Sequence, residues 1–371
     1  MLFLLLACSE KISSETMSEI SANYAEIVHT SYADSVTAAQ TLDTDILAFL
    51  DAPSDAALAT AQDAWLDSRE PYLQTEVYRF YDGPIDNPDT GVEGLLNAWP
   101  LDEAYIDYTV DNADAGIIND TSVTIDADTL MSLNEQGGEE NIATGFHAIE
   151  FLLWGQDLSA DSAGTRAFTD FVTDGSGTAA NQDRRALYLE TVSSLMIEHL
   201  QEVEGAWAAD SENYRSEFLA MDSEEQLRMI MTGMIILTGF ETGGERLQTA
   251  LDSGDQEDEH SCFSDNTHRD MIQDVQGVQN IYLGNYGSVS GPGIKDIVAE
   301  VDADLAERID TEIQAALDAG NALVVPFDNE IAMDNTEGRE RVQTLITNLR
   351  TVEQSLEEAF RAFGLAVPVA E

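Results

Sequence analysis

Apolar side chains recur every three or four residues along most of the chain, which is the spacing that places them on one face of an α-helix. In the first half, this pattern predicts a helix from about Met17 to Leu50, where Asp51-Ala52-Pro53 ends it. A second helix is predicted over residues 54–80, with a bend near Pro71, because proline cannot donate the helical hydrogen bond. No stretch shows the strict apolar–polar alternation of a half-buried strand, so we expect an all-α protein.

The second half of the chain shows the same helical spacing. One helix is predicted over residues 188–203, and the pairing of Ser223 with Gln226 is a capping-box signature that opens another, to about Leu251. The last long helix carries an unbroken apolar stripe over residues 342–360. Each half therefore supplies about four helices, the number that closes a bundle.

The two halves also match in detail, which favours an internal duplication. Arg69, which follows a tryptophan on its helix, parallels Arg246 in E-T-G-G-E-R-L. The sequence W-P-L-D, which ends at Asp102, parallels C-F-S-D, which ends at Asp265. We therefore expect two similar four-helix bundles with the candidate site at their interface, where the irregular connections face one another. The expected units are a truncated signal or anchor segment, a first bundle, a linker and a second bundle, at residues 1–11, 12–160, 161–181 and 182–371.

The charge balance is extreme for a chain of this length. The 371 residues include 71 Asp and Glu against 16 Lys and Arg, a formal net charge of −55, and 43% are hydrophobic, enough for sizeable cores. Such a surface excludes nucleic acid and anionic lipid as partners, because both are recognised through basic patches. It attracts cations and suits a saline habitat, where screening weakens the repulsion between like charges. We attribute most of the Asp and Glu residues to adaptation to that habitat, so the charge alone does not indicate a metal site.

The N-terminus, M-L-F-L-L-L-A-C, resembles the end of a bacterial lipoprotein signal. Leu5-Leu6-Ala7-Cys8 is similar to a lipobox, after which Cys8 would carry the lipid and anchor the protein to the membrane. The apolar run is short and has no basic residue before it, so we expect the true start upstream; a cytosolic protein with an accidental apolar start is the alternative. Cys262 is the only other cysteine, so a lipidated Cys8 leaves no intrachain disulfide and no cysteine zinc site.

The strongest chemical signal is G-F-H-A-I-E, Gly145 to Glu150, inside a predicted helix that is apolar almost all round. His147 and Glu150 are three residues apart, so both point to one face. Because a helix without a polar face is normally buried, this imidazole and carboxylate would cost free energy unless a partner such as a shared cation satisfies them. The alternative is a hydrogen-bonded pair that acts only as a structural pin between helices. Gly145, costly inside a helix, favours the close approach of a ligand or another backbone.

These residues belong to a wider pattern. G-F-H-A-I-E matches the G-x-H-x-x-E signature of the imelysin-like superfamily. Four further segments resemble its iron-regulated protein A branch, namely Y-D-G-P-I-D, N-A-W-P-L-D-E-A-Y-I-D, G-G-E-R-L and D-E-H-S-C-F-S-D-N-T-H. The resemblance covers about residues 20–365, and the segments occur together and in order. It implies two similar four-helix bundles, a site at their interface, a periplasmic or outer-membrane lipoprotein in the cell envelope, and a part in bacterial iron uptake.

Two other helical metal motifs are incomplete here. A zinc metallopeptidase needs two histidines one turn apart and a glutamate base, but Phe151 follows Glu150, so neither H-E-x-x-H nor its inverse is present. A di-iron carboxylate bundle needs Glu-x-x-His on each of two helices. Residues 26–29 fit that motif on a helix, whereas residues 257–260 fit it only within an acidic loop. A metallopeptidase that uses His147 and Glu150 stays open as an alternative.

The candidate metal ligands combine imidazole with carboxylate groups; they are His147, Glu150, Asp265 and His268. Such ligands suit iron or zinc, and hard oxygen ligands favour ferric iron. The alternative for Asp265 is to cap a helix, and the alternative for His268 is to lie in solvent. A second set of polar residues is expected to surround the site and support its ligands; these are Arg69, Asp102, Glu245 and Arg246. For the two arginines, ion pairing between helices is the alternative.

We therefore predict an extracytoplasmic lipoprotein that binds iron, free or chelated, between two helical bundles and passes it to a partner protein of the uptake system. One alternative is the metallopeptidase described above. The other is a binding or structural module without a metal, whose acidic surface is adapted to salt and whose buried His–Glu pair is structural.

Overall fold

The computed structural model of the protein describes residues 12–368. It is helical almost throughout, which confirms the all-α class predicted from the sequence. The elements of the first half are α1 (Ser14–Asp51), α2 (Asp55–Leu73), the 3-10 turn η1 (Glu76–Tyr78), α3 (Glu93–Leu96), α4 (Glu103–Ile106), α5 (Gly116–Asn119), α6 (Ala127–Leu133), α7 (Gly145–Trp154), η2 (Phe168–Phe171) and α8 (Gln182–Ala206).

The second half contains the remaining helices and a hairpin of two short antiparallel strands. Its elements are α9 (Tyr214–Ala220), α10 (Ser223–Ile236), the π-helix η3 (Leu237–Gln248), α11 (Thr249–Ser253), η4 (Gln256–Asp258), α12 (Thr267–Leu283), β1 (Asn285–Tyr286), β2 (Val289–Ser290), α13 (Ile294–Val301), α14 (Ala303–Gly320), α15 (Phe327–Ile331) and α16 (Thr336–Ala362).

The long helices follow the apolar pattern closely. In α1, the Ser13 hydroxyl accepts a hydrogen bond from a backbone N–H of the first turn, and the helix ends at Asp51 as predicted. The second helix ends at Leu73, earlier than predicted, because the chain passes into the separate turn η1. The cap of α10 is Asp222 and not Ser223, since the Asp222 carboxylate accepts from the backbone N–H of Glu225. The predicted N-cap is therefore one residue too late, and a side-chain cap at Asp222 replaces the predicted capping box.

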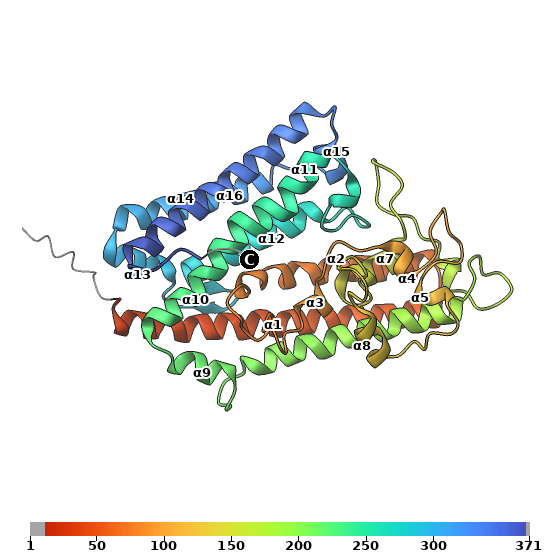
Figure 1. Ribbon diagram of the computed structural model, residues 1–371, viewed down its shortest axis with the longest axis horizontal. Helices are drawn as coiled ribbons and strands as arrows, with labels where there is room; N and C mark the ends of the chain where they lie inside the picture. The colour runs from red at the N-terminus through yellow and green to blue at the C-terminus, as the bar shows by residue number, and fades with distance from the viewer. Residues whose placement is uncertain (1–11, 369–371) are drawn as a thin grey trace, which may run out of the picture.

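The helices gather into two groups that lie side by side (Figure 1). In the first group, α1 packs against α2 and α8, and α7 packs against α8 and α2. In the second, α16 packs against α14 and η3, and α12 packs against α14. Helix α8 contacts the first group, although the expected boundary at residue 182 assigns it to the second. The duplication of one bundle into two stays a prediction.

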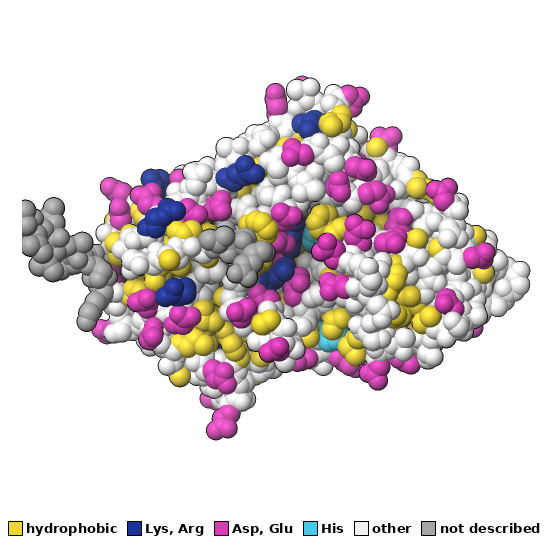
Figure 2. Space-filling model, viewed as in Figure 1, with side chains coloured by type: hydrophobic (Ala, Val, Ile, Leu, Met, Phe, Trp, Pro, Cys, Tyr) yellow, Lys and Arg dark blue, Asp and Glu magenta, His cyan; other side chains and the backbone are white. Residues whose placement is uncertain are grey.

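The two groups meet where α12 runs along α2 and η1. Gly277 makes this contact close, because a Cβ atom at its position would lie 2.5 Å from the carbonyl oxygen of Gln74. The face in Figure 2 carries many acidic side chains and is hollowed between the two groups. Among residues 12–368, no helix has the length and apolar character needed to cross a membrane.

Candidate metal-binding site

Helix α7 carries the G-F-H-A-I-E sequence and is buried along its whole length. Gly145 is its first residue, with a φ of 86°, and a Cβ atom there would lie 2.4 Å from the carbonyl oxygen of Leu96. The glycine is therefore required by the close approach of another backbone at the start of the helix. His147 is 1% exposed and Glu150 is 0% exposed, which confirms the predicted burial.

His147 and Glu150 form a hydrogen-bonded pair on one face of α7, as their spacing predicts. The Nδ1 atom of His147 lies 2.9 Å from Oε2 of Glu150. The other oxygen, Oε1, accepts two hydrogen bonds from Ser264, at 2.9 Å from the backbone N–H and 2.7 Å from the hydroxyl group. The Nε2 atom of His147 is buried and has no hydrogen-bond partner within residues 12–368. The pair therefore uses both carboxylate oxygens and leaves one imidazole nitrogen available.

A second histidine, His260, lies against the first. The ring centroids of His147 and His260 are 4.8 Å apart, and the rings meet at 76°. The Nδ1 atom of His260 lies 2.7 Å from Oδ2 of Asp270. Each imidazole is thus oriented by a carboxylate at Nδ1 and turns its Nε2 away from that carboxylate, which is how proteins commonly orient metal-binding histidines. His260 comes from the loop before α12, so the two rings meet between the two groups of helices.

Asp270 holds the second histidine in place. Its carboxylate accepts hydrogen bonds from the Ser261 hydroxyl at 2.5 Å, from Nη2 of Arg69 at 3.0 Å and from the amide of Asn266 at 3.1 Å. Burial by itself raises the pKa of Asp270, but Arg69 and His260 outweigh burial and hold that pKa below its usual range. Asp270 is therefore ionised at neutral pH. Arg69, predicted near the site, reaches the histidine pair through this carboxylate.

Burial also decides the charge of the two histidines. It lowers the pKa of His147 well below the usual value, with the nearby Arg69 acting in the same direction. It lowers the pKa of His260 to about 3. Both imidazoles are therefore neutral at neutral pH, which is the form that binds metal ions. Burial raises the pKa of Glu150 to about 8, although the hydrogen bonds from Ser264 oppose this change.

A second buried network also joins the two groups. Arg246, on η3, donates to Glu76 at 2.5 Å and to Asp274 at 3.0 Å. Thr242, about one turn earlier on the same π-helix, donates to the same oxygen of Asp274 at 2.8 Å. Asp274 lies one turn after Asp270 on α12, so both networks share that helix. The two predicted arginines thus form buried ion pairs between helices, the alternative raised by the sequence.

The other predicted residues do not join the histidine pair. Asp102 is exposed and caps α4 by accepting from the backbone N–H of Ala104, and Glu245 is exposed on η3. His268 is half-buried, with its Nδ1 3.2 Å from the backbone oxygen of Asp265. The side chain of Asp265 lies among a different set of carboxylates. The four predicted metal ligands are therefore not brought together in one site.

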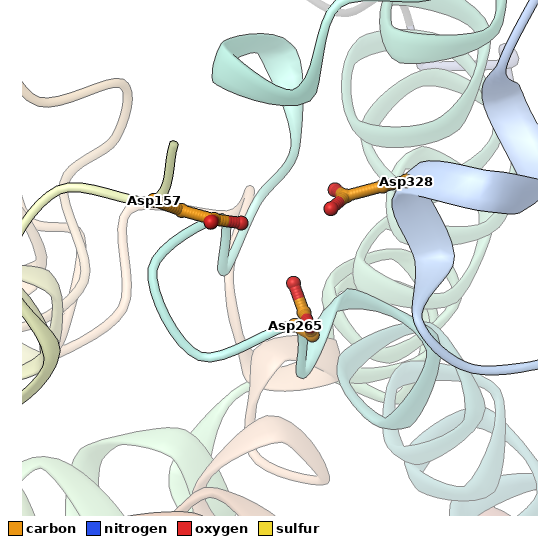
Figure 3. Close-up of side chains that lie close together, drawn as sticks. All are labelled: Asp157, Asp265 and Asp328. Atoms are coloured by element: carbon orange, nitrogen blue, oxygen red, sulfur yellow. The ribbon is translucent and has the colours of Figure 1, made fainter. Parts of the chain in front are cut away.

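Asp265 instead meets two other aspartates. Carboxylate oxygens of Asp157, Asp265 and Asp328 all lie within 4.8 Å of one another (Figure 3). Asp157 follows α7, Asp265 precedes α12, and Asp328 lies on α15. The cap of α12 is Asn266, so the interpretation of Asp265 as a helix cap is wrong. Asp157 and Asp328 are far apart in the sequence and are brought together only by the fold, so no spacing of residues could have predicted their contact.

The sequence pattern also fails to single out His260 and Asp270. One signal for His260 exists, since the segment D-E-H-S-C-F-S-D-N-T-H, which carries part of the family resemblance, includes this histidine. Asp270 lies outside that segment. The two residues are ten positions apart and are joined across a loop, so no helical periodicity relates them.

Comparisons with known proteins agree with the motifs. The Imelysin family model (Peptidase M75) matches residues 28–356. The iron-regulated protein A of Synechococcus elongatus is 23% identical over 361 residues, which cover 95% of this chain and 87% of that protein. A solved structure from Parabacteroides distasonis, assigned as an iron-regulated protein A precursor, matches with a TM-score of 0.68 and 20% identity over 94% of this chain and 97% of that one. An imelysin-like protein from Psychrobacter arcticum matches with a TM-score of 0.70 and 13% identity over 97% and 99%. At these identities the two structures establish the fold alone, and the family resemblance inferred from the motifs is confirmed.

Proposed function

Because the chain belongs to the Imelysin family, we propose that it is an extracytoplasmic iron-binding protein of bacterial iron uptake, with His147 and His260 at the centre of its metal site. An iron-related role is supported by the similarity to iron-regulated protein A. The ion would be iron, with zinc as the other metal that suits imidazole ligands.

The observation that carries this proposal is the matched orientation of the two imidazoles. Glu150 is hydrogen-bonded to Nδ1 of His147, and Asp270 is hydrogen-bonded to Nδ1 of His260. The centroids of the two rings are 4.8 Å apart. A buried imidazole nitrogen without a partner costs free energy, and the Nε2 of His147 is such a nitrogen. A metal ion that binds Nε2 would remove this cost. In this arrangement Glu150 orients His147, because Ser264 holds one of its oxygens and Nδ1 of His147 is hydrogen-bonded to the other.

The position of the histidines supports a site that depends on both groups of helices. His147 belongs to α7, which packs in the first group, and His260 precedes α12, which packs in the second. An ion between them would bind weakly to either half alone. The net charge of −55 would raise the local concentration of iron cations around the molecule.

The cell-envelope location also belongs to the proposal. Cys8, the predicted lipidation site, lies outside the described residues. A lipid at Cys8 would hold the protein at the membrane, where it could receive free or chelated iron and deliver it to a partner protein of the uptake system.

The test is metal analysis of protein purified without chelators. We expect His147→Ala and His260→Ala each to lose most of the bound iron and to keep their helical circular dichroism. His199→Ala is the matched control, because it removes another buried imidazole, on α8, that contacts neither ring. If both site variants retain as much iron as the control, the His–Glu pair is a structural pin and iron binds elsewhere.

A peptidase assay with added zinc, on the wild type and on Glu150→Gln, tests the metallopeptidase alternative. A zinc peptidase needs a carboxylate free to act as a base on a bound water, whereas both oxygens of Glu150 are already engaged in hydrogen bonds with His147 and Ser264. We expect no peptide cleavage after zinc is added. Cleavage that survives extensive purification and disappears in Glu150→Gln would support the enzyme.

A further inference from the structure

We propose that Asp157, Asp265 and Asp328 form a second metal site that binds a hard divalent cation of the calcium class. This site is separate from the histidine pair and does not depend on the proposed iron binding. Its three carboxylates come from three different segments and point toward a common space (Figure 3).

The spacing of the oxygens fits one shared ion. Calcium binds oxygen ligands at about 2.3–2.6 Å, so two ligands on opposite sides of the ion are separated by about 4.6–5.2 Å. The oxygens of the three aspartates all lie within 4.8 Å of one another. Magnesium demands strict octahedral geometry at about 2.0–2.1 Å and is usually held by one or two carboxylates with several waters, so three carboxylates from three separate segments favour calcium, whose geometry is more flexible.

The burial of unpaired charge supplies an independent argument. Ten carboxylates within residues 12–368 are buried. Six of them form an ion pair with an arginine, and a seventh, Glu150, is held in hydrogen bonds by His147 and Ser264. The three that have neither an arginine nor a histidine partner are Asp157, Glu259 and Asp328, and all three lie at this one place. Buried acids in this protein are otherwise paired, so the exception points to a cation that the protein itself does not supply.

A fourth carboxylate, that of Glu259, lies beside the three aspartates and gives separate support for a cation at this place. It is 0% exposed, and neither of its oxygens has a hydrogen-bond partner within the described chain. The same holds for both oxygens of Asp328, which is 4% exposed. Glu259 lies against Asp328, and burial together with this contact raises the pKa of Glu259 well above its usual value, so without a cation the pair holds a proton between its two carboxyl groups. Glu259 can therefore supply a further oxygen.

The donor set determines the class of ion. The three aspartates offer oxygen alone, and carboxylate oxygens prefer hard cations over the softer metals that imidazole or thiolate binds. The ion would tie the loop after α7 to the loop before α12 and to α15. The loop before α12 also carries His260 and Ser264, so the acidic site would fix the segment that completes the histidine pair.

The experiment titrates calcium into the full chain after EDTA treatment and removal of the EDTA. Isothermal titration calorimetry would be run in about 0.5 M NaCl, which shortens the Debye length to well under ~10 Å and suppresses loose binding to the acidic surface. We expect one saturable calcium ion per chain. Asp157→Asn and Asp328→Asn should each weaken it at least about tenfold. Asp161→Asn is the matched control, because this exposed aspartate of the same loop loses the same charge and should bind calcium as the wild type does.

Two further measurements, the melting temperature of Asp328→Asn and calcium binding by His147→Ala, test the site independently of the titration. In EDTA, Asp328→Asn should melt at a higher temperature than the wild type, because it removes repulsion between buried carboxylates, and calcium should then raise its melting temperature less. His147→Ala should bind calcium normally, which separates this site from the proposed iron site. Equal calcium binding by Asp328→Asn and Asp161→Asn, saturation by magnesium but not calcium, or no saturable ion would each overturn the proposal.

Discussion

Ser264 donates two hydrogen bonds to a single carboxylate oxygen of Glu150, although the two residues lie 114 positions apart in the sequence. This contact fixes the loop before α12 against α7. The same loop places His260 beside His147 and adds Asp265 to the acidic cluster. The two proposed metal sites therefore share one short segment, which Ser264 anchors to the first group of helices.

The Ser264 hydroxyl should contribute to stability and to iron binding. Ser264→Ala leaves the buried Glu150 oxygen with one hydrogen-bond donor instead of two, so we expect a loss of about 1–3 kcal/mol in the free energy of unfolding. Iron affinity should fall as well, because Glu150 orients His147 less firmly. Urea denaturation and iron titration would measure the two effects.

Ser21→Ala provides the control for this experiment. Ser21 is also fully buried, but its hydroxyl group has no hydrogen-bond partner within residues 12–368. Its removal should leave stability unchanged or slightly increased. If Ser264→Ala and Ser21→Ala have the same effect on unfolding, the contact to Glu150 does not stabilise the fold.

Glu150 should make the protein less stable as the pH rises. Burial raises its pKa from 4.5 to about 8, so between these values the folded chain holds a proton that the unfolded chain has released. The stability from this group is complete below about pH 4.5 and is lost as the pH rises through about 8, with a slope of at most ~1.4 kcal/mol per pH unit. Other buried acids contribute too, so the comparison must be with Glu150→Gln. Urea denaturation at about pH 5 and pH 8 should show a smaller loss in that variant than in the wild type; parallel losses would contradict the assignment.

Features that depend on neighbouring residues could be predicted from the sequence. The approximate positions of α1 and α16 follow from the three-to-four residue apolar spacing. The burial of His147 and Glu150 on one helix face follows from their own spacing and from the apolar residues around them. In each case the physical cause lies within one helix.

Contacts between distant segments could not be predicted in this way. An apolar stripe on α8 shows which face is buried but not which helix covers it, so the expected boundary at residue 182 separated α8 from its neighbour α1. The pairing of His260 with Asp270 and the meeting of Asp157 with Asp328 arise from loops, where no periodicity operates. The candidate sites are built mainly from such contacts.

Arg69 should be one of the most important polar residues for stability. It is 1% exposed and pairs with the buried Asp270, so Arg69→Ala would leave that carboxylate without its main counter-charge. We expect a loss of about 3–5 kcal/mol in the free energy of unfolding. Arg361→Ala is the control, because Arg361 forms an exposed pair within α16 and should change stability by less than about 1 kcal/mol. Similar losses for both variants, measured by urea denaturation, would show that the buried pair contributes no more than a surface pair.

The acidic surface makes a prediction about salt. At a net charge of −55, repulsion between like charges should destabilise the fold in dilute buffer. Added salt should relieve this repulsion as the Debye length shrinks from ~30 Å at 0.01 M to ~3 Å at 1 M. The melting temperature should therefore climb steeply with sodium chloride. Iron occupancy should change far less, because ligands in direct contact with a buried ion are screened little.

Screening can be separated from specific binding of sodium by two controls. Choline chloride, whose bulky cation cannot enter the aspartate cluster, should raise the melting temperature as sodium chloride does. Asp328→Asn should follow the same salt dependence as the wild type, since it removes only one charge of 71 acidic residues. A flat melting curve in both salts would show that the surface is not adapted to high salt. The acidic residues would then need a functional explanation, and cation gathering by the loop at residues 255–259, next to both proposed sites, would be the first to test.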